Sequence, residues 1–282
     1  MRIAESIGRF GGWLLRRVPG LRWFLATFDA LDAQAAAERA AVGYDPRAEA
    51  ARVRQILLVA AILLVLGYSF GDRPFFTETF GPALSRRPGL ARYADLLSYS
   101  YWSVAKLLGF GLLPLGHLLL RGERAADYGL GRQPVAVGSG VPRLPWLRMY
   151  LLLLVAVLPA VVAVSFTPAF QQSYPFYRQA GRSVFDFLGW ELPYLLTFVA
   201  VEFFFRGYLL FGLRRAFGSH ALFISMVPYC MIHVLKPAPE ALASIFSGLL
   251  LGTLALSTGS LWCGDAVAAA AVSVLAGCRA GA

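Results

Sequence analysis

Long apolar runs joined by short polar connections constrain this chain more than any other feature of its sequence. A helix needs about 20 mainly apolar residues to cross a lipid bilayer. The chain is 58% hydrophobic and 15% charged, whereas a soluble domain typically carries about 25% charged residues. The sequence therefore predicts an all-α fold, a multi-pass transmembrane helical bundle of about seven spans, at residues 55–71, 96–120, 149–166, 188–213, 219–235, 241–258 and 260–278.

The first 54 residues differ from the apolar runs that follow. Residues 2–24 interleave five arginines with large apolar side chains, a pattern typical of a segment lying on a membrane surface. Residues 28–54 are alanine-rich with mixed charges, and they predict a solvated helix leading into the first span. We therefore expect a basic, amphipathic and Ala-rich cytoplasmic segment at 1–54, upstream transmembrane helices and a loop at 55–180, and a C-terminal group of helices at 181–282.

The formal net charge of +10 raises nucleic acid as a partner, but the distribution of the charge argues against it. Basic residues stand in short clusters between apolar runs, where they face lipid headgroups. Counted over the predicted loops, they favour a cytoplasmic N-terminus. Almost all of them are arginines, which we take as a bacterial genome bias. We expect an integral protein of a bacterial plasma (inner) membrane that contacts the lipid bilayer and no nucleic acid.

Ionisable residues inside the predicted spans are the informative ones, because burying a charge in lipid is costly unless it is paired or hydrated. Glu202 and Arg206 are four residues apart, so an α-helix places them on one face within reach of an ion pair. One interpretation is a buried pair that fixes helix packing. The other is a carboxylate oriented by its arginine to hold a metal or to polarise water.

His233 ends the next apolar run. Because the connection between the two runs is short, the helices pack antiparallel, and Glu202 and His233 can meet within the bilayer. A carboxylate and an imidazole in a hydrated cavity can activate water. Glu191 lies about three turns before Glu202. It is either a second carboxylate of that cavity or, as we prefer, an interfacial residue beside Trp190 and Tyr194.

An ordered series of motifs runs from Glu191 to Gly264, and this stretch resembles the CAAX prenyl protease and bacteriocin-processing (CPBP, Abi) family of intramembrane metalloproteases. The series covers about a quarter of the chain. It consists of Glu202-Phe-Phe-Phe-Arg206-Gly207, Tyr229-x-x-x-His233, His233-Val-Leu-Lys236-Pro-x-Pro-Glu240, Ser247-Gly248-Leu-Leu-Leu-Gly252 and Thr258-Gly-Ser-Leu-Trp262.

The resemblance implies that residues 181–282 are the catalytic helices of an intramembrane endopeptidase. It implies cleavage of membrane-tethered peptides or protein C-termini by water that a glutamate and a histidine activate, with or without a metal. The second glutamate of the family's Glu-Glu-x-x-x-Arg pattern falls on Glu202, its arginine on Arg206 and the motif histidine on His233. Glu202 and His233 are then the candidate ligands for zinc or another divalent metal.

Three positions depart from the family pattern. Val201 stands at the first glutamate, Ala268 at the histidine of the third motif and Val272 where Asn or Asp is usual. Asp265, one turn before Ala268, is best interpreted as an acid near a helix start. The departures favour a second hypothesis, a catalytically impaired relative that acts as a membrane peptide-binding, immunity or scaffold protein. A transporter is a third, weakened by the absence of internal repeats.

Overall fold

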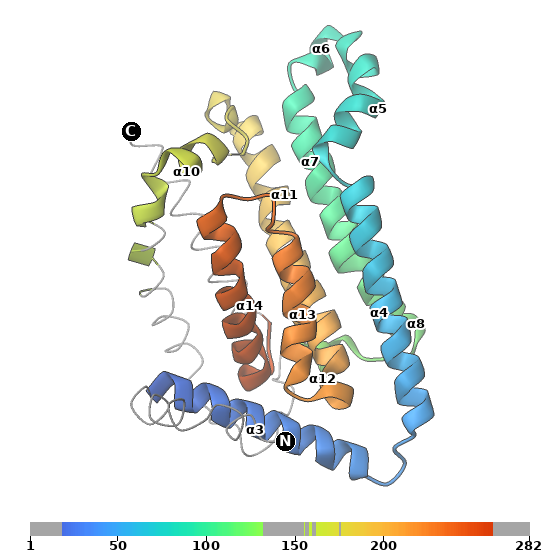
Figure 1. The fold of residues 1–282 in the computed structure, drawn as a ribbon. Helices are drawn as coiled ribbons and strands as arrows, with labels where there is room; N and C mark the ends of the chain where they lie inside the picture. The colour runs from blue at the N-terminus through green and yellow to red at the C-terminus, as the bar shows by residue number, and fades with distance from the viewer. Residues whose placement is uncertain (1–18, 132–154, 156–157, 160–161, 175, 262–282) are drawn as a thin grey trace. The chain divides into compact units, whose positions relative to one another are not determined.

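The computed structural model describes residues 19–131, 155, 158–159, 162–174 and 176–261. Every regular element in these ranges is a helix, which confirms the all-α prediction (Figure 1). The elements outside the apolar helices described next are α3 (Pro19–Ala40), α5 (Arg73–Ser85), α6 (Pro88–Ala91), η2 (Ala125–Tyr128), α10 (Pro168–Ser173) and η3 (Ala180–Arg182).

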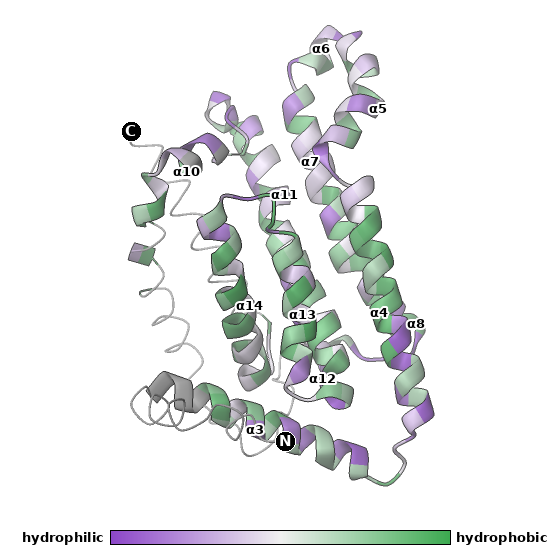
Figure 2. Ribbon diagram, viewed as in Figure 1, coloured by the Kyte–Doolittle hydropathy of each residue, from purple (hydrophilic) through white to green (hydrophobic). Residues whose placement is uncertain are grey.

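Within the described residues, four helices are long and apolar enough to cross a membrane, and Figure 2 shows the hydrophobic stretches of α4 and α14 in green. They are α4 (Pro46–Ser69), Ala94–Leu120, Val184–Phe217 and α14 (Ala238–Thr258). Helix α13 (His220–Met231) is apolar but only 12 residues long. The predicted spans at 149–166 and 260–278 lie largely outside the described residues. The membrane bundle is therefore confirmed, whereas the count of seven spans stays a prediction.

Two of the long helices contain a π-helical segment. The first consists of α7 (Ala94–Lys106), η1 (Leu107–Leu112, π-helical) and α8 (Leu113–Leu120). The second consists of α11 (Val184–Glu202), η4 (Phe203–Phe211, π-helical) and α12 (Gly212–Phe217). A π-helix closes i→i+5 hydrogen bonds; it is rare, and it frequently occurs at functional sites. The sequence predicted continuous α-helices here, because apolar periodicity does not reveal an added residue in a turn.

The chain divides into two compact units. The first unit comprises residues 1–56, 126–149 and 205–261, and the second comprises 57–125, 150–204 and 262–282. The division predicted from the sequence, at residues 54 and 180, stays a prediction.

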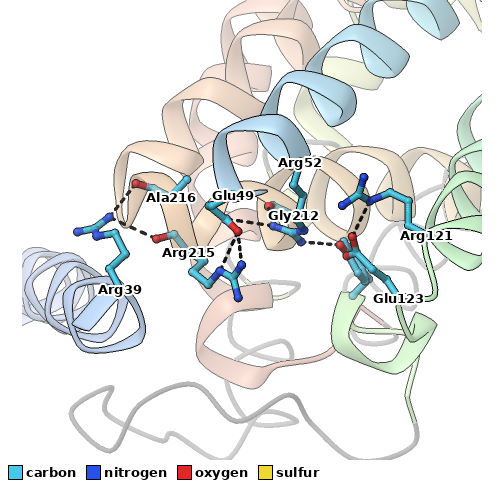
Figure 3. Close-up of polar contacts among 9 residues, drawn as sticks. Arg39, Glu49, Arg52, Arg121, Glu123, Gly212, Arg215 and Ala216 are labelled. Carbon is cyan, nitrogen blue, oxygen red and sulfur yellow. Dashed lines mark hydrogen bonds and ion pairs between the residues drawn. The ribbon is translucent and has the colours of Figure 1, made fainter. Parts of the chain in front are cut away.

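A buried carboxylate organises the polar end of the first unit (Figure 3). Glu49 in α4 is 2% exposed and accepts hydrogen bonds from the guanidinium groups of Arg52 and Arg215. Arg52 also donates to the carbonyl oxygen of Gly212 at 2.8 Å and to the hydroxyl of Tyr128 at 2.6 Å. A buried charge is tolerated when it is paired and hydrogen-bonded in this way. The network therefore joins the start of α4 to α12.

Helix α3 contributes the cap of α13. The carboxylate of Asp32 accepts the Ser219 backbone N–H at 2.7 Å and the Ser219 hydroxyl at 3.0 Å. The first N–H groups of a helix have no partner within it, so an acid at this end is stabilising. Gly218, just before, has φ +55°, and a Cβ built there lies 2.3 Å from Asp32 Oδ1. Only glycine allows this close approach.

The second unit packs α11 against α7 through aromatic side chains. Tyr99, Tyr177 and Trp190 are buried with Leu96, and the Trp190 ring stacks on Tyr194 at a centroid distance of 4.4 Å. Aromatic pairs in such geometries stabilise beyond the area that they bury. This cluster sets the position of the first half of α11.

Asp186, fully buried in the first turn of α11, is held by three neighbouring side chains. It accepts hydrogen bonds from Tyr177 at 2.6 Å, from Ser183 at 2.6 Å and from two nitrogens of Arg182. Burial and the bond to Asp186 raise the pKa of Tyr177, so its hydroxyl remains a donor at neutral pH. The start of α11 is thus fixed by a fully paired acid.

Replacing Asp32 with alanine should lower the free energy of unfolding by about 1 kcal/mol, the usual cost of losing a helix cap. Gly218→Ala should cost about 2 kcal/mol, because it adds backbone strain and a clash. Thermal unfolding of the detergent-solubilised chain measures both. The matched control is Asp29→Ala, since Asp29 is exposed on the same helix. Equal melting temperatures for the Asp32 and Asp29 variants would refute the cap.

Candidate functional site

The most buried of the four candidate spans carries the candidate acid and arginine. In the most apolar 18-residue stretch of this helix, Val184–Phe217, 72% of the residues are buried. In the corresponding stretch of α4 the share is 17%. Every residue from Glu202 to Leu213 is buried, including Arg206, which is 2% exposed. An acid and a guanidinium inside an apolar helix are expensive and imply specific compensation. This stretch is therefore a candidate functional site.

The π-helical geometry of η4 changes which residues share a face of the helix after Glu202. The four-residue spacing of Glu202 and Arg206 places both on one face only in an α-helix. Residues 203–211 are π-helical, so residues five apart lie one above the other there. Spacing alone therefore no longer predicts that the two side chains face each other. Their ion pair stays a prediction.

Arg206 lies against Tyr229 in the first unit. Its guanidinium carbon is 4.0 Å from the centroid of the Tyr229 ring, and the Phe205 ring meets the same tyrosine edge-on at 5.4 Å. Tyr229 itself is 9% exposed. A cation over an aromatic face gains about 2 kcal/mol when the pair is removed from water. The tyrosine thus compensates part of the cost of burying Arg206.

His233 lies against the same tyrosine. The two ring centroids are 4.7 Å apart, and His233 Nδ1 lies 2.9 Å from the backbone carbonyl oxygen of Tyr229. A carbonyl oxygen only accepts hydrogen bonds, so Nδ1 carries the proton. In the neutral imidazole the lone pair is then on Nε2. The residue is placed in the turn that follows α13, with Nε2 as its basic nitrogen.

Helix α14 supports this arrangement from its other side. The Tyr229 hydroxyl is 3.5 Å from the Ser247 hydroxyl. A Cβ built on Gly248 lies 3.2 Å from a Tyr229 ring carbon and 3.1 Å from Met226, so glycine lets α14 approach α13 closely. Beyond His233, Lys236 and Glu240 form an ion pair at 2.5 Å. Parts of three family-like motifs therefore meet around one tyrosine.

Of the three residues predicted from the sequence, the structure brings Arg206 and His233 into contact with the same side chain, Tyr229. Glu202 is 6% exposed and lies in the second unit. Its meeting with His233 stays a prediction. Sequence analysis gave Tyr229 no role of its own. The signal was present in the aromatic-x-x-x-His spacing, which puts the ring one helical turn before the histidine.

The described residues do not complete a metal centre. Within them, no group of three or more His, Cys, Asp or Glu side chains is placed to hold a metal ion. A catalytic zinc is typically held by three protein ligands, and the sequence offers two, Glu202 and His233. The positions where a further ligand was considered, Asp265 and Ala268, lie outside the described residues, as does Val272. The described residues therefore supply two candidate ligands, and a metal at this site stays a prediction.

Residues 183–271 match the family model for the type II CAAX prenyl endopeptidase Rce1-like proteins. The match covers about a third of the chain and contains the whole arrangement around Tyr229. It confirms the resemblance to CAAX prenyl proteases that the ordered motifs indicate. No curated protein and no solved structure matches the chain significantly.

Tyr229→Leu should lower the free energy of unfolding by about 2 kcal/mol, because it removes the aromatic face over which the Arg206 charge is buried. Tyr229→Phe keeps the ring and loses only the 3.5 Å contact with Ser247, so its melting temperature should stay near that of the wild type. Thermal unfolding followed by tryptophan fluorescence measures both. Equal losses in the two variants would show that the ring contacts do not matter.

Proposed function

We propose, from the Rce1-like match of residues 183–271, that this chain is an intramembrane endopeptidase of the CAAX type. Its substrates are membrane-tethered peptides or protein C-termini that enter from the bilayer. The reaction is hydrolysis of a peptide bond by water that Glu202 and His233 activate. The match supports a CAAX-type protease as the kind of function, and the roles of individual residues are part of the proposal.

One observation carries the proposal. Arg206 and His233, which the sequence places on different helices, contact the same buried ring of Tyr229. Both also fall on the motif positions of the protease family. A purely structural role for the arginine would explain its burial but not the histidine beside it, with a basic nitrogen on the ring edge away from the backbone bond.

In the proposed reaction, the carboxylate of Glu202 takes a proton from water while the water oxygen bonds to the carbonyl carbon of the scissile peptide. The carbon–nitrogen bond then breaks, and the proton passes to the leaving nitrogen. Nε2 of His233 accepts a hydrogen bond from the same water and helps to align it. Arg206 is a positioning residue that orients the Glu202 carboxylate through its charge.

We also propose that Glu202 and His233 are two ligands of zinc or another divalent metal, whose usual third protein ligand would come from another residue. No step above passes through a metal. For the orientation, we propose a cytoplasmic N-terminus in a bacterial plasma membrane, because the basic residues gather in the loops predicted on that side.

Glu202→Gln and His233→Ala should each lower cleavage about 100-fold or more, the usual cost of losing an acid–base group. The substrate is a fluorogenic peptide that ends in a prenylated cysteine followed by three residues. Cleavage is measured with the full chain reconstituted in vesicles. The matched control is Glu191→Gln, since Glu191 lies on the same helix and has no proposed role.

If the Glu202 and His233 variants cleave at the rate of the Glu191 variant, Glu202 and His233 do not activate the attacking water. Melting temperatures near that of the wild type are needed to separate a chemical loss from unfolding.

Val201 and Ala268 favour one alternative, a relative that binds membrane peptides without cleaving them. Neither side chain can take a proton or bind a metal. Ala268→His supplies the imidazole that the family pattern has at this position. If the wild type is inactive and this variant cleaves the reporter peptide, the site is otherwise complete and the wild type is an impaired protease. If neither cleaves while both retain the peptide, the binding role is correct.

A further inference from the structure

An apolar groove lies in the second unit between α5, the short α6 and the first turn of α7. It has a volume of about 350 Å³, within the range of small-ligand pockets. The lining consists of Arg87 and six apolar residues, Phe76, Phe80, Ala83, Leu84, Leu90 and Leu97. No step of the proposed hydrolysis uses these residues.

The groove is held open by contacts at one end. Arg73, at the start of α5, pairs with Asp95 of α7 at 2.5 Å and donates to the Ser98 hydroxyl at 3.0 Å. Farther along α5, the rings of Phe76 and Phe80 lie 5.2 and 6.2 Å from the ring of Tyr101 in α7. Phe80 nevertheless remains 43% exposed, and Leu90 of α6 remains 41% exposed. Neither α5 nor α6 contains a buried residue. These side chains therefore line a groove that no other part of the described chain fills.

The charge of the groove is one-sided. Arg87 is the charged residue of the lining, and no ion pair involves Arg86 or Arg87 within the described ranges. Glu78 of α5 is two residues from both Phe76 and Phe80, which places it on the opposite side of the helix. A ligand that fits therefore has a long apolar part and an anionic group at one end.

We propose that this groove binds one anionic phospholipid, with an acyl chain along the apolar lining and the phosphate on Arg87. A guanidinium binds phosphate oxygens in a bidentate manner. An acyl chain has no hydrogen-bonding groups, so the apolar lining can bind it through van der Waals contact alone. A peptide fits poorly, because the groove offers no hydrogen-bonding side chain other than Arg87 for its backbone groups. Helix α5, which forms one wall of the groove, begins four residues after the end of the candidate span α4, so the groove is close to membrane lipid.

Native mass spectrometry of the full chain tests this proposal, with phosphatidylglycerol and phosphatidylcholine of identical acyl chains as probes. The wild type should retain phosphatidylglycerol in preference to phosphatidylcholine. Arg87→Gln should weaken phosphatidylglycerol binding about fivefold. Arg86→Gln is the matched control, since Arg86 is the exposed neighbour that does not line the groove, and it should bind as the wild type does. Ala83→Trp, which fills the groove, should weaken the binding of both lipids.

Equal losses in the Arg86 and Arg87 variants would overturn the proposal in favour of diffuse surface charge. It would also be overturned if the wild type bound both lipids equally, or if Ala83→Trp bound them as the wild type does. Loss of peptide cleavage in Ala83→Trp with unchanged lipid binding would assign the groove to the peptide instead. Melting temperatures of all variants identify any that fail to fold.

Discussion

The burial of one cation in Val184–Phe217, the most buried of the four candidate spans, is the constraint on which the rest depends. Arg206 is 2% exposed in a stretch where every neighbour is also buried. Removing a guanidinium from water costs several kcal/mol. The cation–π interaction with the ring of Tyr229 offsets about 2 kcal/mol of this cost. A remaining cost of this size implies an acid nearby or water in a cavity. Either one would be a component of the hydrolytic site that we propose, in which Arg206 positions Glu202.

The same rule applies to two buried acids of the described chain. Glu49 and Asp186 are both buried, and both are surrounded by arginine, tyrosine or serine donors. Each lies in the first turns of a long helix, where an acid also complements the helix dipole. These two networks fix α4 and α11 at their starts. The packing of α13 on α14 then determines the position of Tyr229.

Physical limits explain which parts of this structure could be predicted from the sequence. Spans such as α4 and α14 were predictable, because a run of apolar residues has one low-energy solution in a bilayer. The π-helix at 203–211 was not, since one added residue per turn leaves no mark in composition. Arg206 and His233 were identified by type and motif, but Tyr229 as their common partner required the packing of α13. The buried network of Asp186 joins a loop to a helix, and sequence distance does not reveal such pairing.

The central claim is that Glu202 and His233 face one hydrated chamber. Cysteine cross-linking tests it most directly, in full-length protein whose three native cysteines have been replaced by alanine. The account predicts that a short thiol-to-thiol reagent links the pair Glu202→Cys and His233→Cys in membranes. It also predicts that the same reagent leaves the pair Glu191→Cys and His233→Cys unlinked. No cross-link at positions 202 and 233, under conditions where both thiols react singly with a small maleimide, would contradict it.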